Sequence, residues 1–149
     1  KGTVGTMKIA MGADHGGYSL KEILKKHLVE AGHEVLDLGT HDTSSCNYPV
    51  YAEKVAYAVA DKDADLGILI CGTGIGISIT ANKVPGIRAA LCSDCFSAAA
   101  TKEHNNANML ALGARVVGEG LALKIVDTFL DTPFSNDERH IRRISMIEG

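Results

Sequence analysis

The sequence predicts an α/β protein in which helices cover both faces of a five-stranded parallel sheet. Short apolar segments with strand character alternate five times with segments whose apolar residues recur at helical spacing. No internal repeat or linker interrupts this alternation, and right-handed strand–helix–strand crossovers make such strands parallel. The chain has 149 residues, 46% hydrophobic and 22% charged, which suits one domain with a buried core.

Each strand is predicted from an apolar run that ends near a glycine or a polar loop. The five runs are Met7–Gly12, His33–Leu38, the segment from Leu66 to Cys71, Ile87–Cys92 and Met109–Leu112. The helices follow from apolar spacing and from start and stop signals. They comprise a helix that contains Leu20–Leu28 and stops at Gly32, one that Pro49 opens, a short one at 77–82, one from the Ser93–Asp94 cap toward Glu103, Gly118–Leu130, and a last one over Ser135–Ile147.

This order indicates a doubly wound, Rossmann-like αβα sandwich that ends in a C-terminal helix. We interpret residues 1–6 (KGTVGT) as an expression remnant, because they are small and patternless, and residues 7–149 as a single domain.

Composition excludes several classes of function. The formal net charge of −3 argues against a general nucleic-acid or membrane-surface binder. No apolar run approaches the roughly 20 residues that span a bilayer, and no signal peptide is visible, so we expect a cytoplasmic protein. The four cysteines are then expected as free thiols. Cys92 and Cys95 form a CxxC pair, but no second pair completes a zinc site, so we predict no metal and no cofactor.

Candidate site residues follow the ends of the predicted strands, where ligands bind in doubly wound folds. Asp14 and His15 follow the first strand, Cys71 ends the third, and Arg115 lies in the loop after the fifth. An acid and an imidazole at the same sheet edge can hold a polar substrate and transfer protons. A helix-capping aspartate next to a surface histidine would account for the first pair equally well.

The glycine loop after Cys71 is the most informative segment. Gly72, Gly74 and Gly76 alternate with other residues, so that backbone N–H groups can approach an anion at a helix start. The loop lacks the third glycine of a dinucleotide fingerprint, since Ile77 occupies that place, and it lacks the lysine of a P-loop. It can hold a phosphate or a developing oxyanion and would favour the thiolate of Cys71 as nucleophile or base. Tight packing is the structural alternative.

A second group of polar residues lies toward the C-terminus. His104 and Asn105 follow a predicted helix, where a left-handed turn would explain them without any function. Arg139 and Arg143 are four residues apart on one helix face and form a fork suited to phosphate, whereas Arg142 points elsewhere. Exposed arginines on helices are, however, often idle.

Several long segments carry a resemblance to a known family. They are IAMGADHGGYSLK, NYPVYA, ILICGTGIGISITANKVPGIRAAL, EHNNANMLALGAR and RHIRR, in this order from Met7 to about Ile147. The chain resembles the type B ribose-5-phosphate isomerases, in the wider family that includes galactose-6-phosphate isomerase. The resemblance implies a metal-free aldose–ketose isomerase that acts through an ene-diolate.

The resemblance also implies residue roles. Cys71 would be the base that moves a proton between C1 and C2, and the amides of Gly72, Gly74, Ile75 and Gly76 would stabilise the ene-diolate, with Thr73 steadying the charge or relaying a proton. Asp14 and His104 would open the furanose ring, His15 and Asn105 would hold the sugar, and Arg115, Arg139 and Arg143 would bind the phosphate. A second subgroup has a glutamate at the position of Ile77, so this chain matches the cysteine-type subgroup.

The family implies a homodimer or a dimer of dimers with sites shared between subunits. The expected partner is therefore a small sugar phosphate and a second copy of the chain, with no nucleic acid and no membrane. Two alternatives stay open here: an isomerase of a six-carbon sugar phosphate such as allose or galactose 6-phosphate, and a non-catalytic phosphate- or nucleotide-binding module. A binding module would have no need of Cys71.

Overall fold

The computed structural model describes residues 5–149, so four of the six residues interpreted as a remnant lie outside the described residues. Its five strands form one parallel sheet in the order β2-β1-β3-β5-β4. The strands are β1 (Lys8–Ala13), β2 (Glu34–Asp37), β3 (Leu66–Cys71), β4 (Ala89–Leu91) and β5 (Met109–Gly113). The predicted parallel α/β class is confirmed.

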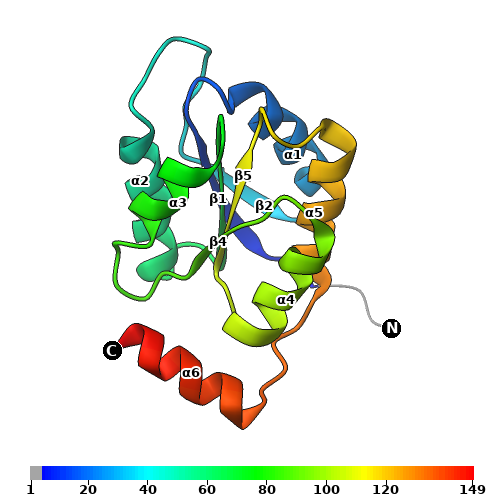
Figure 1. The fold of residues 1–149 in the computed structure, drawn as a ribbon. Helices are drawn as coiled ribbons and strands as arrows, with labels where there is room; N and C mark the ends of the chain where they lie inside the picture. The colour runs from blue at the N-terminus through cyan, green and yellow to red at the C-terminus, as the bar shows by residue number, and fades with distance from the viewer. Residues whose placement is uncertain (1–4) are drawn as a thin grey trace.

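Helices cover both faces of the sheet (Figure 1). They are α1 (Tyr18–Glu30), α2 (Tyr48–Ala60), α3 (Ile75–Ala81), α4 (Cys95–Asn105), α5 (Glu119–Asp131) and α6 (Glu138–Glu148). Side chains alternate along each strand, so one core lies between the sheet and α1, α4 and α5, and a second lies between the sheet and α2 and α3. Ile68 and Ile70 face the first core, whereas Leu69 and Cys71 face the second. The side chain of Cys71 therefore points toward the layer of α2 and α3.

The strand order reverses between β1 and β3. The chain passes from β1 outward to β2 and then returns to the other side of β1, which opens a crevice at the carboxyl ends of β1 and β3. These ends, together with the long β2–α2 loop, lie at the top of the view in Figure 1, whereas α6 lies below the opposite edge. Within residues 5–149, no helix is long and apolar enough to span a bilayer.

The boundaries of β4, α3 and α6 differ most from the prediction. β4 covers only Ala89–Leu91, because the amide of Ile87 bonds to the carbonyl of Val84 and the amide of Arg88 to the side chain of Asn108. These two amides therefore form hydrogen bonds outside the β-sheet, so neither residue extends the strand. α3 begins at Ile75, two residues before the predicted start, after Gly74 adopts a left-handed φ of 80°.

The sixth helix also begins later than predicted. α6 starts at Glu138 instead of Ser135, because the Asp137 side chain accepts a hydrogen bond from the Arg139 amide and caps the helix there. The predicted Asp94 cap is confirmed by a bond of 2.7 Å from the Ser97 amide to Oδ1 of Asp94. Asn106 adopts the left-handed turn expected after α4, with a φ of 44°.

Candidate functional site

Asp14 is held rigidly at the carboxyl end of β1. The residue is 8% exposed, and its Oδ1 accepts a hydrogen bond of 3.1 Å from the Gly17 amide. A Cβ on Gly16 would lie 3.4 Å from this Oδ1 and 3.6 Å from the Gly72 amide nitrogen. The Asp14 carboxylate and the start of the glycine loop therefore lie on either side of Gly16.

Cys71 receives a hydrogen bond from its own loop. The Gly74 amide donates to Sγ of Cys71 at 3.1 Å, and the thiol group is buried, with the residue 5% exposed. A backbone N–H group is therefore the hydrogen-bond donor to this sulfur, and a charged sulfur would accept the same bond. The left-handed conformation of Gly74 turns this amide back toward the sulfur, so glycine is required at this position.

The other amides of the loop differ in their partners. The amide of Ile75 donates to Oγ1 of Thr73 at 3.1 Å. The amides of Gly72, Thr73 and Gly76 have no hydrogen-bond acceptor within residues 5–149. Thr73 is exposed, whereas Gly72 and Gly76 are half-buried. The loop thus offers free donors beside the sulfur, at the start of α3, where the helix dipole also favours negative charge.

Arg115 joins this edge from the loop after β5. Its amide donates to the carbonyl of Gly72 at 2.9 Å, and its side-chain Cδ lies 3.4 Å from the position that a Cβ on Gly72 would occupy. The side chain is exposed, and it forms no ion pair with residues 5–149. A free guanidinium at the rim of the cradle is available for an anionic group.

His15 is exposed at the same edge and faces the β2–α2 loop. Its Nδ1 lies 3.3 Å from the backbone nitrogen of Cys46, which donates to it, and 3.9 Å from the Cys46 sulfur. Because Nδ1 accepts this bond, the neutral imidazole carries its proton on Nε2 and can donate it to a substrate oxygen.

Tyr48 was given no role by the sequence reasoning, yet it reaches the glycine loop. A Cβ on Gly76 would lie 2.5 Å from Cζ and 2.6 Å from the hydroxyl of Tyr48, so the bare backbone at Gly76 makes room for this phenol. The tyrosine lies in the NYPVYA segment and is the first residue of α2, directly before Pro49. A hydroxyl at the end of a polar loop was the signal that could have identified it.

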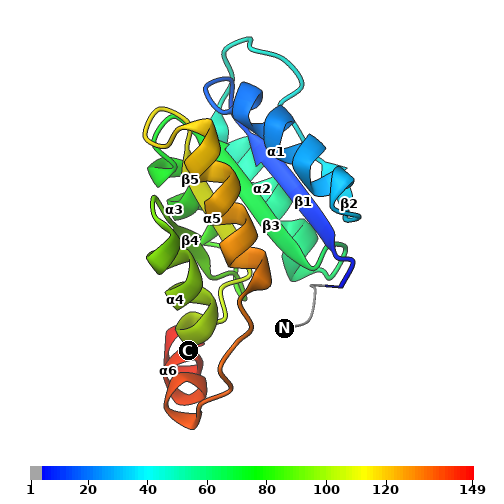
Figure 2. The same ribbon diagram turned by 90° about the vertical axis from the view of Figure 1, so that its right-hand side faces the viewer.

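The four remaining predicted residues lie at the opposite edge of the sheet. His104 and Asn105 end α4 just before β5 begins, and Met109 pairs with Gly67 near the start of β3, four residues before Cys71. At about 3.3 Å per residue, this offset is about 13 Å along the sheet. Arg139 and Arg143 lie on α6, which packs beside the end of α4 below this edge (Figure 2). One chain therefore brings together Asp14, His15, Cys71, the glycine loop and Arg115, but not His104, Asn105, Arg139 and Arg143.

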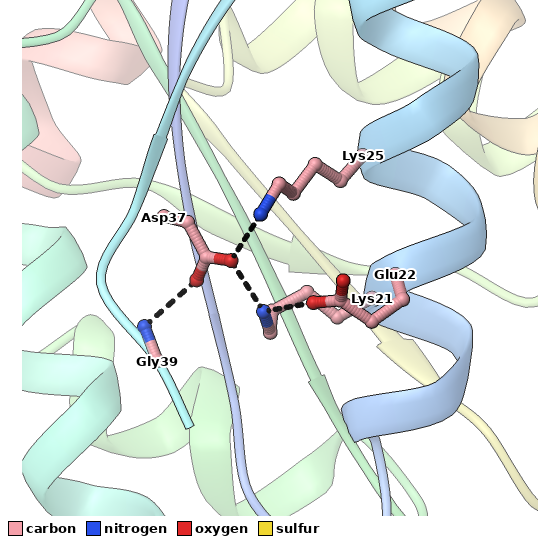
Figure 3. Close-up of polar contacts among 5 residues, drawn as sticks. All are labelled: Lys21, Glu22, Lys25, Asp37 and Gly39. Carbon is pink, nitrogen blue, oxygen red and sulfur yellow. Dashed lines mark hydrogen bonds and ion pairs between the residues drawn. The ribbon is translucent and has the colours of Figure 1, made fainter. Parts of the chain in front are cut away.

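A partly buried polar network lies at the carboxyl edge (Figure 3). Asp37 at the end of β2 accepts hydrogen bonds from Lys21 at 2.7 Å, from Lys25 at 2.9 Å and from the Gly39 amide at 3.0 Å. Despite the cost of burial, these donors hold the pKa of Asp37 at about 2, below its ordinary value of 3.8. Gly39 in turn accepts from the Ala13 amide at 2.7 Å, so the network reaches the residue before Asp14.

The CxxC pair, Cys92 and Cys95, lies where β4 meets α4. Burial raises the pKa of Cys92 to about 11, and the charge of Asp94 adds to this effect, so its thiol is inert at neutral pH. All four cysteines are free thiols. Among the residues that the structure describes, no three His, Cys, Asp or Glu side chains are grouped in a way that could hold a metal ion.

Comparison with known proteins identifies the family. The family model described as Ribose/Galactose Isomerase matches residues 9–147. The chain belongs to this family. It is 51% identical to ribose-5-phosphate isomerase B of Escherichia coli over 140 residues, which are 94% of this chain and 93% of that protein. It is also 44% identical to the galactose-6-phosphate isomerase subunit LacB of Clostridium acetobutylicum, over 86% of this chain and 74% of that one.

Solved structures of the family have the same fold. Ribose-5-phosphate isomerase B of Clostridium thermocellum superposes with a TM-score of 0.94 at 54% identity, with 95% of each chain covered. The type B ribose 5-phosphate isomerase of Trypanosoma brucei has a TM-score of 0.93 at 46% identity, over 97% of this chain and 98% of that one. The family resemblance predicted from the sequence motifs is therefore confirmed.

Proposed function

We propose that the chain interconverts D-ribose 5-phosphate and D-ribulose 5-phosphate through an ene-diolate, with Cys71 as the general base. The observation that carries this proposal is the hydrogen bond from the Gly74 amide to Sγ of Cys71, beside loop amides that have no acceptor within residues 5–149. The relatives named above, most of all the ribose-5-phosphate isomerases, support the substrate. Neither a six-carbon substrate nor a non-catalytic binding module is favoured.

The proposed chemistry moves one proton between neighbouring carbons. The Cys71 thiolate removes the proton from C2 of the open-chain aldose, the carbonyl bond opens, and negative charge collects on the oxygen of C1. The thiol then returns the proton to C1, the proton of the C2 hydroxyl passes to the charged oxygen of C1, and the oxygen of C2 becomes the ketose carbonyl. The free amides of Gly72, Thr73 and Gly76 are the donors that we assign to the charged oxygen, each worth about 3 kcal/mol when well placed. Thr73 contributes its hydroxyl as a further donor or proton relay.

The ring must open before this step, because a closed furanose has no free carbonyl at C1. We assign ring opening to Asp14 and His104, and we assign sugar binding to His15 and Asn105. Arg115, Arg139 and Arg143 bind the phosphate. Since these residues divide between two edges of the sheet, one chain supplies only part of each site.

A second copy of the chain completes the site in this proposal. A two-fold axis perpendicular to the strands reverses the strand direction, and so it brings the amino edge of one copy beside the carboxyl edge of the other. Exposed apolar side chains suited to such an interface lie on α3, at the edge strand β4 and at the start of α4: Ile75, Ile79, Leu91 and Phe96, the last of which is 82% exposed. We also propose a cytoplasmic location, because free cysteines suit a reducing compartment.

Isomerisation in deuterated water tests the chemistry. We expect ribulose 5-phosphate to form with label at C1, and Cys71→Ala to bind ribose 5-phosphate in calorimetry while its kcat falls by about 10² or more. Cys92→Ala is the matched control, because Cys92 is also a buried free thiol but faces the other core. Allose 6-phosphate and galactose 6-phosphate serve as competing substrates. Near wild-type turnover by Cys71→Ala would assign the base to another residue.

Subunit mixing tests the shared site. Cys71→Ala and His104→Asn should each be inactive alone, but a mixed dimer would contain one site with neither change and one site with both. Random 1:1 reassociation makes half of the dimers mixed, so we expect about a quarter of wild-type activity to return. If each chain held a complete site, mixing would restore no activity.

A further inference from the structure

One buried side chain fastens the C-terminal helix to the rest of the molecule. Within α6, His140 is the buried residue, with 7% of its surface exposed. Figures 1 and 2 both show α6 beyond the sheet and next to the end of α4. The helix carries Arg139 and Arg143, and the end of α4 carries His104 and Asn105. His140 therefore lies between the two groups of residues that the amino edge contributes.

The imidazole of His140 contacts the imidazole of His104. The ring centroids are 4.5 Å apart and the planes are inclined by 34°. His104 itself is exposed, so His140 covers part of a ring that otherwise faces solvent. Such an offset contact limits the rotation of the exposed ring about its side-chain bonds.

Ser135 fixes the orientation of His140 in turn. Its Oγ lies 3.1 Å from Nδ1 of His140 and accepts a hydrogen bond of 3.2 Å from the Asp137 amide. The Asp137 amide occupies one lone pair of Oγ, and we assign the hydroxyl hydrogen to Nδ1 of His140. This assignment places the proton of neutral His140 on Nε2. The Ser135 amide also donates to the carbonyl of Glu103 at 3.2 Å, so the serine is itself attached to α4 next to His104.

We infer that His140 is a positioning residue for His104, which it contacts ring to ring while Ser135 holds it from the other side. The inference rests on the proposed function, in which His104 opens the sugar ring. It adds a requirement that the family roles do not contain: His104 acts correctly only when His140 supports its ring. The same contact holds α6, which carries Arg139 and Arg143, next to the end of α4, where His104 lies.

The charges around His140 agree with this role. Burial lowers the pKa of His140, the neighbouring His104 lowers it further, and Arg139 and Arg143 act in the same direction, whereas Asp137 opposes them. His140 is therefore neutral when the enzyme works near pH 7. A neutral ring can pack against His104 in either protonation state of that residue, because an imidazolium also interacts favourably with an aromatic face.

A double-mutant cycle on kcat, measured at saturating ribose 5-phosphate, tests the inference. We expect His104→Asn to lower kcat by about 10² or more and His140→Leu to lower it about tenfold, the range in which a misplaced proton-transfer group acts. The double variant should lie within about twofold of His104→Asn alone, because His140 acts only through His104. If the loss of kcat in the double variant equals the product of the two single losses, the inference is overturned.

Smaller changes separate positioning from folding. Ser135→Ala removes the hydroxyl but keeps both rings, so kcat should fall a few-fold while KM stays constant. His140→Phe keeps a ring against His104 and should behave like Ser135→Ala rather than like His140→Leu. Arg142→Ala and Ser145→Ala, on exposed positions of α6, are controls with wild-type kinetics expected. Unchanged kcat in both His140 variants, with the fold intact by circular dichroism, would also refute the role.

Nitrogen NMR of the histidine rings gives a readout without substrate. We expect the Nε2–H tautomer for neutral His140, loss of this preference in Ser135→Ala, and displaced His104 ring signals in His140→Leu. An Nδ1–H tautomer, or His104 signals that do not change, would contradict the inference. A wild-type protein that fails to isomerise ribose 5-phosphate would refute the proposed function instead. The NMR measurement would still test the contact between His140 and His104, because it does not depend on activity.

Discussion

Replacement of Asp37 by asparagine should lower the free energy of unfolding by about 2 kcal/mol at pH 7. In the wild type, Asp37 accepts hydrogen bonds from both Lys21 and Lys25 (Figure 3). The Lys21 side chain is 0% exposed, and within residues 5–149 Glu22 is its one other anionic partner, at 2.8 Å. Asparagine has nearly the same shape, but it leaves the buried ammonium with much of its charge uncompensated.

The magnitude follows from the pKa of Asp37. A carboxyl group whose pKa falls from 3.8 to about 2 on folding has a charged form that the fold stabilises by roughly 2.4 kcal/mol. We expect slightly less, about 2 kcal/mol, because 12% of the side chain remains in contact with solvent, which screens the interaction. Removal of one partner from a fully buried pair costs about 3–5 kcal/mol, which sets an upper limit.

The pH dependence has a definite sign. Since folding lowers the pKa of Asp37, its stabilising effect is complete above the unfolded value of 3.8 and disappears as the pH falls toward about 2. Urea unfolding at pH 7, 5, 4 and 3 should show a constant gap between wild type and Asp37→Asn down to about pH 4, and then a shrinking gap.

A surface ion pair provides the control for Asp37. Asp127 lies 2.7 Å from His27, but 51% of its side chain is exposed, so Asp127→Asn should change stability by less than about 1 kcal/mol. The reasoning about the buried pair would be refuted if Asp37→Asn lowered the free energy of unfolding at pH 7 by less than Asp127→Asn does. It would also be refuted if the difference between wild type and Asp37→Asn stayed constant from pH 4 to pH 3.

Four further substitutions have defined expected outcomes. Gly17→Ala would place a Cβ 2.3 Å from the carbonyl oxygen of Ile70, so chemical unfolding should show a loss of more than about 2 kcal/mol, and a smaller loss would mean that the backbone shifts freely. Lys102→Met should be up to about 1 kcal/mol more stable than wild type at pH 7, because burial lowers the pKa of Lys102; this gap should narrow toward pH 10, and a gap that widens would contradict the sign. Arg139→Ala and Arg143→Ala should each raise KM about tenfold with a smaller effect on kcat, and an unchanged KM would remove that arginine from the phosphate site.

The sequence was sufficient for the residues at the carboxyl edge. Cys71, Asp14 and Arg115 each follow a strand, and parallel strands end at a common edge, so their proximity could be predicted from order alone. The strand order β2-β1-β3-β5-β4 could not be predicted in the same way. It depends on which strand pairs with β5, and apolar runs such as Met109–Leu112 do not encode the identity of their neighbours.

Other features depend on contacts between segments far apart in the chain. Tyr48 reaches Gly76 only because α2 and α3 pack on the same face, and helical periodicity gives no sign of that contact. His140 was passed over for a related reason. In the segment RHIRR the charged residues define the pattern, whereas the partner that buries His140 is His104, thirty-six positions earlier in the chain. Separation of this kind also hides the fact that Arg139 and Arg143 lie far from Cys71.

The hydrogen bonds of the glycine loop divide its amides into two groups with different proposed tasks. The Gly74 amide donates to Sγ of Cys71 and is assigned to the sulfur of the proposed base. The amides of Gly72, Thr73 and Gly76 have no acceptor within residues 5–149 and are assigned to the substrate oxygen. When the thiolate takes the proton, negative charge leaves the sulfur and collects on that oxygen. If the sulfur and the substrate oxygen both lie among these fixed amides, the charge can move between them with little rearrangement of the protein. Preorganised dipoles lower a reaction barrier most under this condition.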